Sequence, residues 1–191
     1  MKEVTIKAYS YDELSDKAKE NAVNHYMEGL VGDWWHENAY DDAKEFCLDI
    51  QEFDIYRNYC NAKFVYDADE TAKAIIDGAG GRLFDIAEDY QKEVSELFKG
   101  YSDYDKYQEW LRERDYTLDD LEFEDWVIEE TDYQDDKESA GNEFLRELEE
   151  YYLSYLKTDY EYLHSEEYIE DFYELNDYLF DINGKVLDYG N

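Results

Sequence analysis

Carboxylates are the side chains best suited to chemistry in this 191-residue chain, and they are concentrated in one segment. Residues 119–138 (DDLEFEDWVIEETDYQDDKE) contain 11 Asp and Glu against a single base, Lys137. Carboxylates held on a folded surface attract a site rich in Lys and Arg, such as one that binds a nucleic-acid backbone. Leu121, Phe123 and Trp126 can anchor the segment, so we expect it to be at least partly ordered.

The carboxylates expected to bind a partner extend beyond this segment onto two later helices. The helix expected over residues 139–157 directs Glu143, Glu147 and Glu150 outward, and the acids over residues 161–177 flank it. The predicted partner-binding residues are Asp119, Asp120, Glu122, Glu124, Asp125, Glu129, Glu130, Asp132, Asp135, Asp136, Glu138, Glu143, Glu147, Glu150, Glu161, Glu166 and Glu167.

Catalytic chemistry finds little support in the sequence. The only histidines are His25, His36 and His164, and none lies in a recognisable signature. Paired carboxylates are so frequent that no single pair indicates an acid and base couple. We therefore expect a protein that is not an enzyme and has no catalytic residues.

Metal and cofactor sites are also not expected. Asp67 to Glu70 and Asp103 to Asp105 resemble the start of a calcium loop, but neither continues into its Gly and terminal Glu. Asp69 is instead expected to cap a helix. Gly80 and Gly81 lack the Lys and Ser or Thr of a phosphate loop, so they predict a corner between helices.

Composition indicates a folded chain in spite of its charge. The net charge is -35, from 53 Asp and Glu against 18 Lys and Arg, which alone would favour disorder. However, 43% of residues are hydrophobic and 22 are Tyr, which is enough to form a sizeable core. Two interpretations of the charge remain open: a functional surface, or a face that only keeps the protein solvated or adapted to salt.

Charge and hydropathy also bear on partners and location. An anionic membrane or nucleic acid would repel this chain, so we expect no direct binding to either. No stretch has the roughly 18 apolar residues of a membrane span, and MKEVTIKAYSYDEL lacks the apolar segment of a signal peptide. We expect a cytoplasmic protein in which Cys47 and Cys60 are reduced thiols. The sequence leaves open whether it is a monomer or a homodimer.

The first hundred residues alternate between strand and helix patterns. We expect a strand over residues 4–9 and a helix that begins at Ser15, with Ala18, Ala22, Tyr26 and Leu30 on one stripe. A second helix is predicted over residues 33–47, with Trp35 on its apolar stripe. Strands over 48–56 and 62–66 should form a hairpin around a turn at 57–61, followed by helices over 69–77 and 83–99.

The remaining residues predict helices and a last hairpin. Helices over 139–157 and 165–177 precede strands over 178–182 and 185–189, joined by Asn183 and Gly184, a strong hairpin signal. The predicted fold is α+β, with a small antiparallel sheet covered by helices and a helical, acidic second half. We expect an α+β core over residues 1–100 and an acidic, Tyr-rich helical region over residues 101–191, whose hairpin returns to the sheet. Together they should form one compact unit.

Three segments resemble a family of small phage and prophage proteins that is sometimes labelled antitoxin-like. They are SYDELSDKAKENAVNHY, DWWHENAYDDAKEFCLDIQEFDIYR and NDYLFDINGKVLDY. The family shares an aromatic-DELS-x-x-AK segment, a Trp-bearing helix leading into a strand, and a short hairpin with Asp or Asn followed by Gly. The shared positions Leu14, Ala18, Trp35, Phe53 and Gly184 are structural in type, so the resemblance implies a phage setting and no catalytic residue.

Charge and phage setting together predict an inhibitor that imitates nucleic acid. Its expected partner is a host nucleic-acid-binding protein with a basic channel, such as a CRISPR effector or a restriction enzyme, bound stoichiometrically. Such a protein would be an anti-CRISPR or antirestriction DNA mimic, an analogy of composition and origin. The alternative is a protein–protein adaptor, or an antitoxin-like neutralising protein, whose charge serves solubility.

Overall fold

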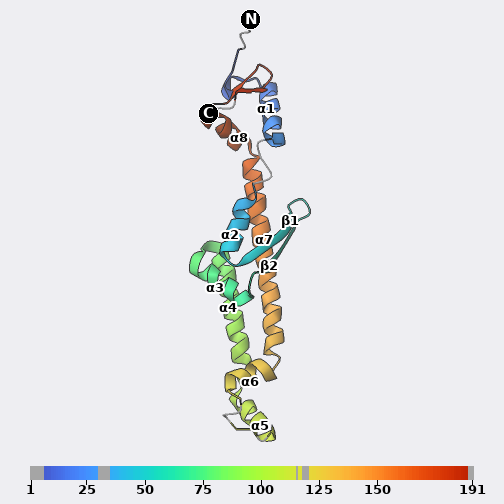
Figure 1. Ribbon diagram of the computed structural model, residues 1–191, viewed down its shortest axis with the longest axis vertical. Helices are drawn as coiled ribbons and strands as arrows, with labels where there is room; N and C mark the ends of the chain where they lie inside the picture. Colours follow the sequence, from blue (N-terminus) through green and yellow to red (C-terminus); the bar gives the residue numbers. More distant parts are fainter. Residues whose placement is uncertain (1–6, 30–34, 115, 118–120, 189–191) are drawn as a thin grey trace. The chain divides into compact units, whose positions relative to one another are not determined.

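The computed structural model describes residues 7–29, 35–114, 116–117 and 121–188 (Figure 1). In these ranges the chain forms a short 3-10 helix η1, eight α-helices and two antiparallel ladders of two strands each, which confirms the α+β class. The elements are η1 (Tyr11–Glu13), α1 (Asp16–Gly29), α2 (Glu37–Glu45), β1 (Leu48–Asp54), β2 (Tyr59–Phe64), α3 (Ala68–Gly78), α4 (Gly81–Tyr101), α5 (Tyr104–Arg114), α6 (Phe123–Glu130), α7 (Tyr133–Leu163), α8 (Glu166–Leu175), β3 (Leu179–Phe180) and β4 (Val186–Asp188).

The chain divides into two compact units. Unit 1 comprises Met1–Asn38 and Tyr155–Asn191, and unit 2 comprises Ala39–Ser154. The division therefore runs through α2 and α7, whereas the change in charge along the sequence lies near residue 100. Unit 1 joins the two ends of the chain.

Unit 1 is built around an aromatic core between α1 and α8. The predicted stripe of α1 is confirmed for Ala18, Ala22 and Tyr26, which are buried, while Leu30 lies outside the described residues. Tyr173 of α8 is buried against this stripe, and its hydroxyl donates a hydrogen bond to the Ala22 carbonyl at 2.8 Å. That bond satisfies the only polar atom of a large core side chain.

The C-terminal hairpin packs into the same unit. Tyr9 and Phe180 exchange two backbone hydrogen bonds of 2.9 Å, so the chain near the N-terminus pairs with β3 as expected. Most of the strand predicted over residues 4–9, and residue 189 of the last strand, lie outside the described residues. Gly184 has a φ of +81°, and a Cβ there would lie 1.9 Å from the Ala18 carbonyl oxygen. Only glycine fits this close approach between the hairpin and α1.

The two ladders are separate, which corrects the expectation of a single small sheet. The C-terminal strands are also shorter than predicted, because the Asp181 carboxylate accepts hydrogen bonds from the backbone N–H of Asn183 and Lys185 and holds these residues in a loop. The ladder of β3 and β4 belongs to unit 1, and that of β1 and β2 to unit 2.

The β1–β2 hairpin of unit 2 has a tighter turn than predicted. Leu48 pairs with Phe64 and Asp54 with Tyr59, so the prediction of a turn at residues 57–61 is wrong. The Asp54 carboxylate accepts hydrogen bonds from the N–H of Tyr56 and Arg57 at 3.0 and 2.9 Å. This Asx turn closes the hairpin before Tyr59, and β2 therefore begins earlier in the sequence.

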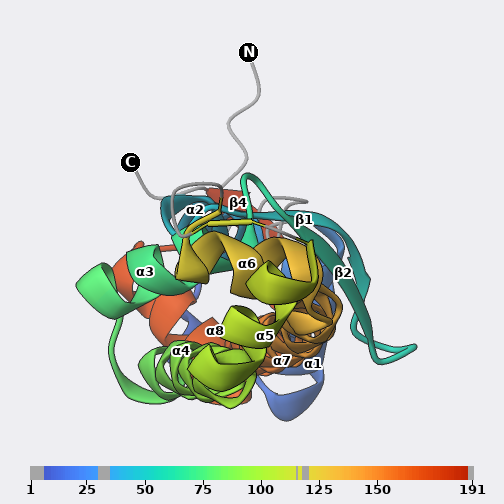
Figure 2. The ribbon, with the colours of Figure 1, turned by 90° about the horizontal axis from the view of Figure 1, so that it is seen from below.

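Helices α4 and α7 run antiparallel along unit 2 (Figures 1 and 2). Tyr90 of α4 stacks on Phe144 of α7 with ring centroids 4.5 Å apart, and Phe98 meets Tyr133 at 5.5 Å. The buried Tyr133 shows why α7 begins before the predicted residue 139: packing against α4 extends the helix.

Two details of the helix termini correct the sequence predictions. The cap of α3 is Asp67, whose carboxylate accepts from the Glu70 N–H at 2.8 Å, and not Asp69. Helix α2 spans Glu37–Glu45 and is therefore shorter than the helix predicted over residues 33–47. Residue 33 lies outside the described residues. Trp35 precedes α2 in a turn, half-buried, with its ring edge against Tyr160 at 5.3 Å.

Candidate acidic partner-binding surface

Helix α6 and its N-cap Glu122 direct five of the 11 predicted acids of the segment 119–138 into solvent. Trp126 and Val127 are buried and share a core with Tyr133 at the start of α7. This apolar side fixes the orientation of the short helix, and the acids on its remaining surface are exposed. They are Glu122, Glu124, Asp125, Glu129 and Glu130, while the predicted Asp119 and Asp120 lie outside the described residues.

The first part of α7 continues the acidic surface. Asp132, just before the helix, and Asp135, Asp136, Glu138, Glu143, Glu147 and Glu150 are all exposed. At 100° per residue, Asp136, Glu143, Glu147 and Glu150 fall on one exposed stripe, about a quarter turn from the buried Phe144. Because α6 and the start of α7 share a core, their acids belong to one region of unit 2, which we call the α6–α7 acidic surface.

The charge density of this surface can be compared with that of a duplex. The stripe from Asp136 to Glu150 is about 21 Å long at 1.5 Å per residue. B-DNA would present about 12 phosphates over that length, so one helical stripe supplies only a fraction of the density. The α6 acids, together with Asp135 and Glu138, are therefore needed to approach it.

Most of these carboxylates have no counter-charge within hydrogen-bonding range. Among the described acids that the sequence predicted, only Glu143 forms an ion pair, with Arg146. Asp136 accepts a hydrogen bond from the Tyr101 hydroxyl at 2.5 Å. That bond, reinforced by the charge of Asp132 and other nearby acids, raises the pKa of Tyr101 to about 12, because the phenolate would be repelled. The Tyr101 hydroxyl therefore stays protonated at neutral pH and donates to the acidic surface.

The acids of helix α4 have different surroundings, and they are not among the predicted partner-binding residues. Asp85, Asp89 and Glu96 are exposed at helical spacing in the same unit, but Lys92 and Lys99 lie on the same stripe. Such a mixed face is expected of an ordinary solvated helix. The i, i+4 spacing of acids would have found these carboxylates, and the intervening lysines explain why they form a weaker candidate.

Glu149 shows that not every acid of α7 serves the surface. It is half-buried, and its carboxylate accepts a hydrogen bond from the Ala62 N–H of β2 at 2.8 Å. The bond satisfies a backbone donor on the edge of the β1–β2 ladder. Glu149 therefore joins a strand to a helix, in contrast to its exposed neighbour Glu150.

The last three predicted acids, Glu161, Glu166 and Glu167, are exposed but belong to unit 1. Ser165 caps α8 by accepting from the Tyr168 N–H, which leaves Glu166 and Glu167 in the first turn. Acids at that position stabilise a helix through its dipole, so their presence has a structural reason of its own. The structure therefore groups the predicted acids into two sets, one in each unit.

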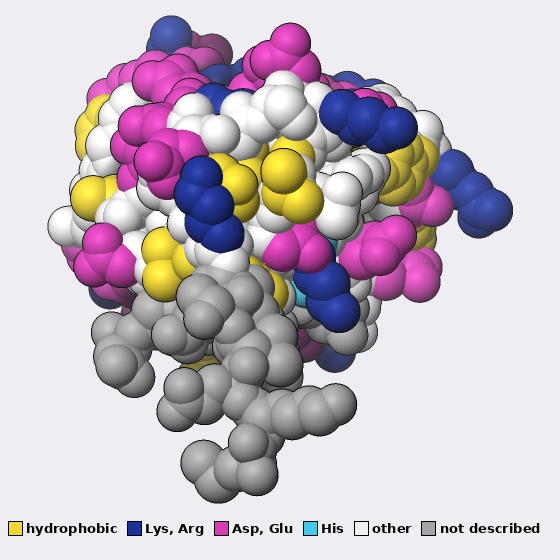
Figure 3. Space-filling view, turned by 90° about the horizontal axis from the view of Figure 1, so that it is seen from above, with side chains coloured by type: hydrophobic (Ala, Val, Ile, Leu, Met, Phe, Trp, Pro, Cys, Tyr) yellow, Lys and Arg dark blue, Asp and Glu magenta, His cyan; other side chains and the backbone are white. Residues whose placement is uncertain are grey.

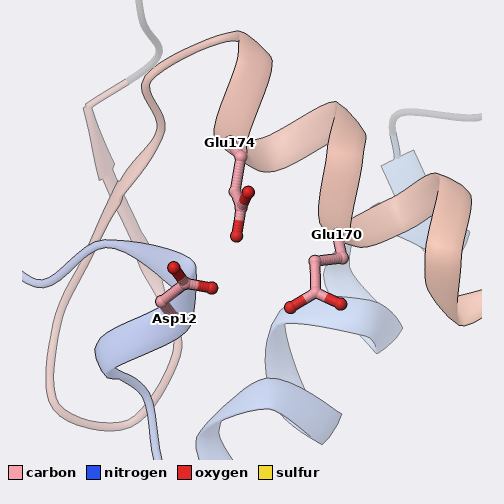
Figure 4. A group of neighbouring side chains, drawn as sticks. All are labelled: Asp12, Glu170 and Glu174. Atoms are coloured by element: carbon pink, nitrogen blue, oxygen red, sulfur yellow. The ribbon is translucent and has the colours of Figure 1, made fainter.

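Unit 1 also contains the group of carboxylates best placed to hold a cation among the described residues. Asp12 of η1 and Glu170 and Glu174 of α8 point toward one another, with one oxygen of each within 4.8 Å of the others (Figure 4). A hydrogen bond with Asp12 raises the pKa of Glu174, and Glu170 already pairs with Lys19 at 3.4 Å. The Lys19 ammonium thus neutralises part of this group.

Elsewhere the surface mixes both signs of charge. Figure 3 shows Asp and Glu side chains over the face seen from above, with Lys and Arg side chains between them. No helix of the described residues is long and apolar enough to cross a membrane. A search of family models, of curated proteins and of solved structures found no match to this chain.

Proposed function

We propose that this protein is a stoichiometric inhibitor that imitates nucleic acid and occupies the basic site of a nucleic-acid-binding protein. The α6–α7 acidic surface supports this most directly. Its carboxylates are exposed, lie on ordered helices and are almost free of paired bases. Ordered carboxylates bind a basic channel without the entropic cost of ordering a tail, and long-range attraction speeds association.

The proposed setting is the cytoplasm of a phage-infected host, and the proposed target is a defence nuclease such as a CRISPR effector or a restriction enzyme. This part of the proposal depends on the resemblance of the N- and C-terminal segments to phage proteins. It also fits the chemistry, because such enzymes hold nucleic-acid backbones in channels rich in Lys and Arg.

Competition is the deciding experiment. The tagged full chain is incubated with bacterial host lysate at low salt, and the retained protein is then challenged with duplex DNA, duplex RNA or rising salt. We expect one retained protein that binds nucleic acid, is displaced by it, and dissociates with a steep dependence on salt. A complex that binds nucleic acid simultaneously and without loss of affinity would contradict mimicry.

The second candidate is an adaptor or antitoxin-like neutralising protein that binds through aromatic residues. The exposed tyrosines of the β1–β2 region favour it, since Tyr56 is 82% and Tyr66 74% exposed. Trp126 does not, because it is buried. A complex that resists high salt would support this candidate, because apolar contacts are not screened.

A further inference from the structure

A pocket of about 460 Å³ lies beside the α6–α7 acidic surface, between the start of α3 and the first turns of α7. Its walls include Phe64 and Tyr66 after β2, Asp67 and Asp69 of the α3 terminus, and Asp135 and Glu138 of α7. All of these residues belong to unit 2. The volume suits a side chain of a binding partner.

The carboxylates of the pocket differ in whether they are already bound. Asp67 caps α3, and Asp69 accepts hydrogen bonds from the Tyr90 hydroxyl at 2.9 Å and the Lys137 ammonium at 2.5 Å. Asp135 and Glu138 are exposed and have no ion pair or hydrogen bond among the described residues. They lie three residues apart on α7, which places them next to each other on one face of the helix.

Lys137 shows which charge the pocket favours. Burial lowers the pKa of this ammonium, but the hydrogen bond and charge of Asp69 outweigh burial, so that the pKa lies above its ordinary value. The positive end of α3 does not reverse this preference, because Asp67, Asp69 and Glu70 surround it. The pocket therefore already stabilises one cation and retains two carboxylates for a second.

Aromatic walls distinguish this pocket from a simple group of acids. Tyr66 is 74% exposed, and Phe64 is half-buried with its ring stacked on Phe144 at 5.8 Å. A guanidinium is planar, weakly hydrated and able to stack on aromatic faces while it pairs with carboxylates, whereas an ammonium is a strongly hydrated point charge. Carboxylates beside aromatic rings thus favour Arg over Lys.

On the basis of the function proposed above, we propose that this pocket receives an arginine side chain of the basic partner. Asp135 and Glu138 would pair with the guanidinium, and Phe64 and Tyr66 would pack against its plane. The α6–α7 acidic surface supplies long-range attraction, and the pocket supplies a fixed point that sets the register of the complex.

The test compares labelled oligoarginine and oligolysine peptides of equal length, titrated with the full chain at low and moderate salt. We expect oligoarginine to bind about fivefold more tightly, in the range of an exposed cation–π contact. The double variant Asp135→Asn, Glu138→Gln and the single variant Tyr66→Ala should each abolish this preference. All three positions are exposed, and circular dichroism verifies the fold.

Matched controls separate the pocket from charge in general. Glu147→Gln with Glu150→Gln removes the same charge from α7 outside the pocket, and Tyr56→Ala removes an exposed tyrosine from the β1–β2 turn. Both controls should keep the preference for arginine, although the first weakens both peptides.

Equal affinities in the unchanged protein, or a preference that survives in the pocket variants, would overturn the arginine site. If both peptides still bind in a salt-dependent manner, the proposed function is unaffected. If neither peptide binds at low salt, the proposed function fails together with the pocket.

Discussion

The carboxylates of η1 and α8 in unit 1 and those of α6 and α7 in unit 2 have different surroundings. In unit 1, Glu170 pairs with Lys19, and Glu174 forms a hydrogen bond with Asp12. On the α6–α7 acidic surface the predicted acids face solvent, and only Glu143 has an ion-pair partner among the described residues. The first set contributes to a packed unit, whereas the second is the set that we propose binds a partner.

Composition alone does not reveal this difference. Unit 1 contains 18 acidic and 6 basic residues and unit 2 contains 35 and 12, a ratio near three to one in both. Electrostatic function depends on where charges are held and on whether they are neutralised nearby. The net charge of -35 is therefore a weaker indicator than the arrangement of α6 and α7.

Tryptophan truncation tests the packing of the two units and should have the largest effect. Trp126→Ala in unit 2 should lower the free energy of unfolding by about 3–5 kcal/mol, because the side chain is buried. Trp35→Ala in unit 1 should cost only about 1–2 kcal/mol, since it removes a half-buried ring edge against Tyr160. Urea denaturation measures both, and equal losses would contradict the difference in burial.

Gly184→Ala tests whether unit 1 can unfold independently of unit 2. The new Cβ would meet the Ala18 carbonyl in a left-handed conformation, so we expect a loss of about 2–4 kcal/mol. Gly100→Ala is the matched control, because its Cβ would have no neighbour within 4 Å. Cys60 reports on unit 2: it is buried, and burial raises its pKa to about 11.

In the Gly184→Ala variant we expect alkylation of Cys60 to remain slow while unit 1 unfolds at lower urea. Rapid alkylation in step with the loss of unit 1 would mean that the two units unfold as one.

Charge reversal tests where the binding energy lies. Reversal to Lys of Glu124, Glu129 and Glu130 on α6 should weaken binding to the retained partner on the order of a hundredfold, because each change removes an attraction and adds a repulsion. The control reverses Asp16, Glu20 and Glu28 on α1, which are also exposed. Equal losses in the two variants would show that only total charge matters. Affinity is measured by titration at fixed salt.

The smallest effect is expected from pH at Glu174. The hydrogen bond with Asp12 raises its pKa above the ordinary 4.5, so the folded state binds a proton more tightly than the unfolded state. This stabilisation is present below pH 4.5 and is lost as pH rises through the raised pKa. Glu174→Gln should therefore raise Tm slightly at neutral pH and flatten the dependence of Tm on pH. If the dependence of Tm on pH is the same in Glu174→Gln as in the unchanged protein, the proton that stabilises the folded state is not bound at Glu174.

Local periodicity was sufficient to determine much of the secondary structure. Ala18, Ala22 and Tyr26 repeat at helical spacing, and they form the buried stripe of α1. Asn183 and Gly184 indicated a hairpin, which the structure confirms with shorter strands. Short-range rules of this kind succeed because neighbouring residues determine helix faces and turns. The same rule placed Glu143, Glu147 and Glu150 of α7 outward, and all three are exposed.

Tertiary contacts decided the rest. Asp69 has the sequence context of a cap, yet it binds Tyr90 and Lys137, and the cap is Asp67. Glu149 and Glu150 are identical neighbours, but only Glu149 meets the Ala62 N–H of β2.

Two larger features arise in the same way. Unit 1 joins segments from opposite ends of the chain, and the pocket beside Asp135 combines residues that follow β2 with the first turns of α7. The sequence indicated that the C-terminal hairpin pairs with the chain near the N-terminus. The packing of α8 on α1 and the pocket each require partners far away in the sequence, and these are specified by how the helices and strands pack.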